Sequence, residues 1–109
     1  MNNNMSEYTQ APEFDVTIKQ MIKWYGDDEM KVICMEECAE LIQAISKSLR
    51  GKPDSRDNLL EEMADVVICL RALKIMYDIT PRALDKWIES KTLRNAKRLK
   101  IEKGKKGWQ

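Results

Sequence analysis

The chain has no histidine, and it has few of the residues that interrupt helices, with only 4 glycines and 3 prolines among 109 residues. This scarcity, together with 43% hydrophobic and 34% charged residues, argues against a β-sandwich or a disordered chain and favours a helical globular domain. The absence of histidine also weakens a zinc site. Structural zinc takes four Cys or His ligands, and the chain offers only Cys34, Cys38 and Cys69.

Long apolar runs are missing as well. No uninterrupted apolar stretch is long enough to span a bilayer. The first ten residues, MNNNMSEYTQ, have neither the basic start nor the apolar run of a secretory signal. The three cysteines fall within helical patterns, as buried thiols do in a reducing compartment. We therefore expect a cytoplasmic protein without a membrane partner.

The length of the chain allows one domain. Its core would be modest, so that partner copies of the chain would add stability. The formal net charge is only +1, which by itself implies no polyanionic partner. The charge is unevenly distributed, because residues 91–106 contain eight basic residues and one acid, Glu102.

Apolar residues at three- and four-residue spacing predict four helices, over about residues 14–25, 29–49, 59–77 and 80–103. The second and third have broad apolar surfaces. The apolar stripe of the second helix contains Met30, Cys34, Cys38, Leu41, Ile45 and Leu49.

Residues with stop or capping chemistry mark the helix boundaries. Gly26 is a stop signal after the first helix, and the two aspartates that follow it can cap the second. Asn58 or Asp57 can cap the third helix. Thr80, followed by a proline, starts the fourth helix, and Gly104 ends its pattern.

Four helices with short connections predict an all-α, four-helix antiparallel bundle. Some of these helices are apolar on more than one face, which is what a bundle needs if it also packs against a second copy. We expect a flexible arm over residues 1–13, a helical domain over residues 14–103 and a basic tail over residues 104–109.

Two acidic segments interrupt the apolar helix faces: EECAE at 36–40 and EEMAD at 61–65. Residues three apart share a helix face, so Glu37 neighbours Glu40, and Glu62 neighbours Asp65. Inward-facing anions are costly unless protons, basic partners or a hard divalent cation compensate them. Because the second and third helices would be antiparallel neighbours, their acid pairs could converge on one or two ions. Solvated acids, or acids bridged to lysines, are the alternative.

Three segments together resemble the MazG-like all-α nucleoside triphosphate pyrophosphohydrolases. They are EECAELIQAISK at 36–47, EEMADVVICL at 61–70 and KTLRNAKR at 91–98. This superfamily also includes dimeric dUTPases, dCTP pyrophosphatases and phosphoribosyl-ATP pyrophosphatases. The resemblance covers most of residues 14–100, and the pair of acidic motifs is its more specific part.

The resemblance implies roles for the matching residues. The acids that hold Mg²⁺, or Mn²⁺ in its place, would be Glu37, Glu40, Glu62 and Asp65. Glu36 and Glu61 lead the two motifs, and Glu36 or Glu37 could accept the proton of the attacking water. The residues near the phosphates would be Lys91, Arg94, Arg98 and, from the end of the second helix, Lys47.

The implied function is Mg²⁺-dependent hydrolysis of a (deoxy)nucleoside triphosphate to the monophosphate and pyrophosphate, by a homodimer or homotetramer. The chain has no glycine-rich loop of the form G-x-x-x-x-G-K-[ST], which excludes a P-loop enzyme. Metal and side chains would have to hold the triphosphate instead. Trp24, Tyr25 and Trp87 could stack on the base, but packing in the core or an interface is the more ordinary role for such aromatics.

Two alternatives stay open. One is a phosphoribosyl-ATP pyrophosphatase, which would use the same metal site on a different substrate. The other is a non-enzymatic helical module, in which the acids pair in buried salt bridges and residues 91–106 bind nucleic acid. Little aromatic interleaving accompanies that basic run, so we expect no nucleic-acid partner.

Overall fold

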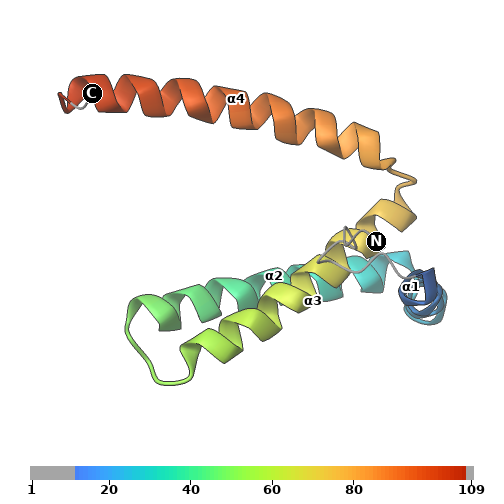
Figure 1. Ribbon diagram of the computed structural model, residues 1–109. Helices are drawn as coiled ribbons and strands as arrows, with labels where there is room; N and C mark the ends of the chain where they lie inside the picture. Colours follow the sequence, from blue (N-terminus) through green and yellow to red (C-terminus); the bar gives the residue numbers. More distant parts are fainter. Residues whose placement is uncertain (1–11, 108–109) are drawn as a thin grey trace, which may run out of the picture. The chain divides into compact units, whose positions relative to one another are not determined.

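The structure is a computed structural model that describes residues 12–107. In that range it contains four α-helices and no strand: α1 (Pro12–Tyr25), α2 (Asp27–Leu49), α3 (Ser55–Met76) and α4 (Pro81–Lys105) (Figure 1). The prediction of an all-helical chain with four helices is confirmed. None of the helices in the described part is both long and apolar enough to cross a membrane.

Two predicted boundaries are confirmed. Gly26 has a φ of 86° and separates α1 from α2, a backbone conformation that glycine adopts without the steric cost of a Cβ. Thr80 caps α4: its hydroxyl accepts a hydrogen bond from the Ala83 N–H at 3.2 Å, and Pro81 follows as the first helical residue. The aspartates after Gly26 lie in the first turn of α2 and do not cap it; carboxylates there favour the positive end of the helix dipole.

Other boundaries differ from the predictions. Helix α1 begins at Pro12, inside the predicted arm, while residues 1–11 lie outside the described range. Helix α3 begins at Ser55, and its N-cap is Asp54, with a φ of 58°. Its first turn, Ser-Arg-Asp-Asn, has no apolar residue, so periodicity detects the helix only from Leu59. Helix α4 continues past Gly104 to Lys105.

Helices α2 and α3 form an antiparallel hairpin that turns at residues 50–54 (Figure 1). The Cys34 thiol donates a long hydrogen bond, 3.8 Å, to the backbone carbonyl of Cys69 across this hairpin. Helix α1 packs against both helices near the open end. There Ile18, Met30 and Ala72 form the buried core.

The chain divides into two units, residues 1–78 and 79–109. The first contains α1 and the α2–α3 hairpin, and the second contains α4. A four-helix bundle closed by α4 therefore stays a prediction, whereas the packing of α1 on the hairpin is part of the structure.

Candidate metal centre

The hairpin brings carboxylates from the two acidic segments together. Each of Glu37, Glu40 and Glu62 offers an oxygen, and these oxygens all lie within 4.8 Å of one another. Oxygens on opposite sides of a bound Mg²⁺ would be about 4 Å apart, because each Mg–O bond is about 2.1 Å. Three of the four predicted ligands are thus close to the spacing that a single cation requires.

The fourth predicted ligand, Asp65, is joined to this group through Glu37. A hydrogen bond between the two carboxyl groups, followed by burial and by the negative charges of Asp65, Glu40 and Glu62, raises the pKa of Glu37 to about 7. A nearby lysine or arginine would lower this pKa, yet burial and the neighbouring acids all raise it. The geometry therefore gives no support to the salt-bridge interpretation of Glu37.

Glu62 has an unusual environment for a carboxylate. Its Oε1 atom is buried and has no hydrogen-bond partner among residues 12–107, while its Oε2 atom accepts a hydrogen bond from the Asn58 side-chain amide at 3.4 Å. Burial, and then the charges of Glu40 and Asp65, raise the pKa of Glu62. A buried anionic oxygen without a partner is costly, so this oxygen is suited to a cation.

The donor set fits a hard divalent cation. All four candidate ligands are carboxylates, and oxygen ligands of this kind suit Mg²⁺, Mn²⁺ or Ca²⁺ rather than a soft metal. The first acids of the two motifs do not join these ligands: Glu36 and Glu61 are exposed, and neither belongs to the group of three converging acids.

The predicted phosphate-binding residues are all exposed. Lys47 lies in the last turn of α2, within the first unit. Lys91, Arg94 and Arg98 lie on α4, within the second unit. The Lys91 ammonium stands over the Trp87 ring, 5.9 Å from its centre.

The candidate aromatic residues lie at the surface of their units, and the prediction that all three thiols are buried is wrong for one of them. Trp24 is 83% exposed and Trp87 is 66% exposed, so neither fills the core of its unit as ordinary aromatic residues would. Tyr25 is also exposed. Cys34 and Cys69 are buried as expected, but Cys38 is exposed, because it lies on the outer side of α2.

Asn58 is a site residue that the sequence interpretation missed. We expected it to cap α3, but α3 begins three residues earlier, and its amide instead holds a Glu62 oxygen. The signal was present in the sequence, because residues four apart on a helix face each other and an amide can pair with a carboxylate there.

No protein-family model matches the chain, and no curated protein or solved structure matches it either. The resemblance to the MazG-like superfamily therefore depends on the sequence motifs alone, and the acidic cluster has to be judged on its own geometry.

Proposed function

We propose that the chain is a Mg²⁺-dependent nucleoside triphosphate pyrophosphohydrolase, which hydrolyses a (deoxy)nucleoside triphosphate to the monophosphate and pyrophosphate and so cleans the cytoplasmic nucleotide pool. The observation that carries the proposal is the convergence of Glu37, Glu40 and Glu62, with a buried Glu62 oxygen that has no hydrogen-bond partner in the described part of the chain. The choice of a nucleoside triphosphate as the substrate depends on the acidic and basic sequence motifs.

In this proposal Glu37, Glu40, Glu62 and Asp65 hold the cation. Asp65 becomes available once Glu37, which is hydrogen-bonded to it, loses its proton. The bound cation supplies polarisation of a phosphate oxygen and a lower pKa for a coordinated water. Glu37, or the exposed Glu36 beside it, accepts the proton of the attacking water.

The basic residues neutralise the phosphates. Arg94 and Arg98 offer planar forks for phosphate oxygens, and Lys91 and Lys47 offer compact charges. Stabilising the charge that develops on the pyrophosphate leaving group is the largest contribution such residues make. The exposed rings of Trp24 and Trp87 are available to stack on the base. Assembly as a homodimer or homotetramer belongs to the same proposal.

The direct test is a panel of ribo- and deoxyribonucleoside triphosphates incubated with the full chain and Mg²⁺, with pyrophosphate and orthophosphate followed separately. Pyrophosphate release from at least one nucleotide is expected, and chelation of the metal should abolish it. Release of orthophosphate alone would point to a different reaction. Turnover of none of them, together with strong salt-dependent nucleic-acid binding, would favour the non-enzymatic alternative.

Three isosteric variants test the site. Glu37→Gln and Asp65→Asn should each abolish Mg²⁺-dependent pyrophosphate release while the helical circular dichroism stays unchanged. Glu29→Gln, in the first turn of α2 and away from the cluster, is the matched control and should keep full activity. Full activity in either of the first two variants would show that the site is assigned wrongly.

A further inference from the structure

Two buried cysteines, Cys34 of α2 and Cys69 of α3, meet across the hairpin. The Cys34 thiol donates a hydrogen bond to the Cys69 backbone carbonyl at 3.8 Å. Burial, followed by a hydrogen bond between the two thiols, raises the pKa of Cys69 to about 12. The two residues are 35 positions apart in the sequence, so the folded hairpin alone brings their sulfur atoms into contact.

The spacing of the two helices at this level suits a disulfide. A disulfide needs Cα atoms within about 7 Å of each other and side chains that point toward each other. The hydrogen bond between the thiols meets the second condition. A thiol that also reaches the backbone of the opposite helix indicates a short distance between the helices. The neighbouring Ala72 is fully buried, and such a small side chain at the contact allows this close approach.

Metal binding does not account for the pair. The third thiol, Cys38, is exposed. Among the described residues, the side chains that converge as candidate metal ligands are glutamates and include no cysteine. Two thiols are too few for a structural zinc site, which takes four ligands. Disulfide formation, in contrast, needs only two facing thiols and an oxidant.

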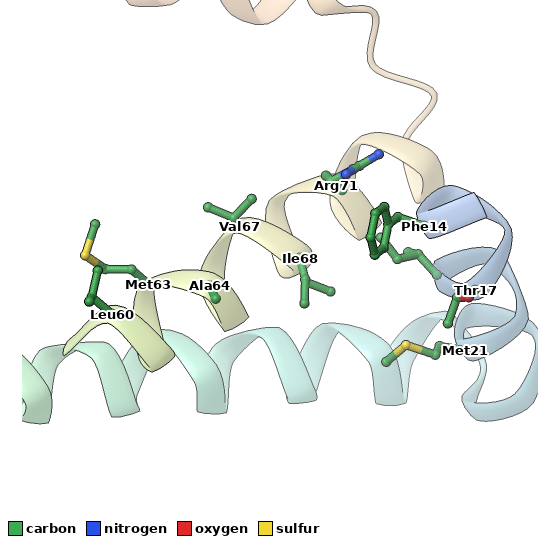
Figure 2. Close-up of a pocket in the computed structure, with 10 residues that line it drawn as sticks. Phe14, Thr17, Met21, Leu60, Met63, Ala64, Val67, Ile68 and Arg71 are labelled. Carbon is green, nitrogen blue, oxygen red and sulfur yellow. The ribbon is translucent and has the colours of Figure 1, made fainter. Parts of the chain in front are cut away.

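Neither of the two buried cysteines lines the groove on the surface of the first unit. This groove, of about 620 Å³, lies between α1 and the side of α3 that carries Ala64, Val67 and Ile68 (Figure 2). Cys69 follows Ile68 directly in the sequence, but its thiol faces α2 instead. An oxidant therefore reaches the two thiols only when the hairpin opens locally, and such openings occur in native proteins.

We propose that Cys34 and Cys69 form a reversible disulfide when the chain meets a small-molecule disulfide as the oxidant, and that this bond locks α2 to α3. In a reducing compartment the pair stays as two thiols, because disulfides there are transient and respond to the redox state. Ordinary packing of two small buried side chains is the alternative. The two interpretations differ in what an oxidant does to the pair.

The oxidation takes two exchange steps. Cys34 loses its proton and attacks one sulfur of the small disulfide, whose sulfur–sulfur bond breaks as one small thiol leaves. Cys69 then loses its proton and attacks the Cys34 sulfur, so that the second small thiol leaves and the Cys34–Cys69 bond forms. Each small thiol takes up one proton, and two electrons pass from the cysteines to the small disulfide. Cys69 acts second because its raised pKa disfavours the thiolate, and proximity assists a step within one chain.

The bond would form next to the acidic cluster. Cys34 precedes Glu37 by three residues, and Cys69 follows Asp65 by four, so the crosslink lies about one helical turn from this carboxyl pair. It would hold the two helices together beside the acids that repel one another, whether or not a cation is bound. The inference does not depend on the proposed function, because the thiol chemistry requires neither metal nor nucleotide.

The test is disulfide mapping of the full chain after incubation in a glutathione redox buffer, with a chelator and without denaturant. Free thiols are alkylated, and the chain is digested with trypsin. Cleavage after lysine and arginine places Cys34 in residues 32–47 and Cys69 in residues 57–71. We expect these two fragments to be joined in the wild type and equally in Cys38→Ser, where only the buried pair can form the link. Cys34→Ala should lose the joined fragments completely, and dithiothreitol should release them.

Stability gives an independent measurement of the same bond. A disulfide across this loop constrains the unfolded chain, so the urea midpoint of oxidised Cys38→Ser should lie above that of its reduced form. Glutathione attached to both buried cysteines, no oxidation without urea, or joined fragments that disappear in Cys38→Ser would each overturn the proposal. A lower midpoint for the oxidised form would overturn it as well, because the bond would then strain the hairpin instead of locking it.

Discussion

The carboxyl groups of Glu37 and Asp65 share a hydrogen bond across the α2–α3 hairpin, and this contact helps Glu37 to hold its proton to an unusually high pH. Isolated glutamates lose their proton near pH 4.5, whereas the pKa of Glu37 is about 7. The pair therefore couples the protonation of the site to both the stability of the fold and the binding of a cation.

The first prediction concerns stability and pH. Because the pKa of Glu37 is higher in the folded chain than in the unfolded chain, the folded state gains stability by holding this proton. That gain is complete below about pH 4.5 and is lost as the pH rises through about 7. In chelator, the urea midpoint should thus fall between pH 5.5 and 8. Glu37→Gln should flatten this fall, while Glu29→Gln should leave it as in the wild type; an equal fall in all three proteins would contradict the assignment.

The second prediction concerns the cation. Binding of Mn²⁺ must displace the proton of Glu37, so it should be tighter at pH 8 than at pH 6. At 100 times the dissociation constant a ligand stabilises the folded state by about 2.7 kcal/mol, so the melting temperature should rise clearly on adding Mn²⁺. Glu62→Gln should remove most of this rise, because it replaces the carboxylate whose Oε1 atom lacks a partner. Electron paramagnetic resonance of free Mn²⁺ gives the affinities, and unchanged binding in the variant would exclude Glu62 as a ligand.

The third prediction separates two roles for Asn58. As the donor to the Glu62 carboxylate, Asn58 orients a ligand, and loss of such a partner typically weakens metal binding 10–100-fold. As an N-cap it would instead contribute about 1 kcal/mol to stability. Asn58→Ala should therefore weaken Mn²⁺ binding while the metal-free melting temperature hardly changes. Unchanged Mn²⁺ binding together with a lower metal-free melting temperature would show instead that Asn58 acts as an N-cap.

The fourth prediction concerns the basic residues of α4. Lys91→Ala and Arg94→Ala should raise the KM for the nucleoside triphosphate roughly 10–100-fold, as expected for loss of a charge-assisted phosphate contact, and leave Mn²⁺ affinity unchanged. Lys100→Ala removes an exposed charge from the same helix and should have little effect. Equal, salt-dependent losses at all three positions would indicate a diffuse nucleic-acid surface instead.

The sequence predicted much of the helical structure and the members of the acidic cluster. The presence of each helix could be predicted from apolar residues at three- and four-residue spacing. The hairpin could be predicted because two long apolar helices are joined by a short turn. Glu37, Glu40 and Glu62 could be placed together because both their spacing and the antiparallel pairing are regular. The link between Asp65 and Glu37 could not be predicted, since it depends on a proton.

The sequence could not decide which apolar face of α2 points inward. The single predicted stripe mixed Met30 and Cys34, which are buried, with Cys38 and Leu49, which are exposed. When a helix is apolar on two faces, its periodicity identifies both faces but does not show which of them is buried. The role of Asn58 was hidden for a related reason, because an apolar pattern cannot detect the polar first turn of α3.

The position of the acidic cluster along the hairpin has a consequence for local opening. The apolar core lies at the open end, around Ile18, Met30 and Ala72, and the acids lie between it and the turn at residues 50–54. Without a cation, and above about pH 7 where Glu37 has lost its proton, repulsion at mid-hairpin leaves the turn-side half held by few buried residues, among them Ala44. Amide hydrogens of residues 41–60 should then exchange as a separate, faster unit than those near Met30 and Ala72. A bound cation would merge the two halves into one cooperative unit, so occupancy of the site would be visible as slower exchange many residues away.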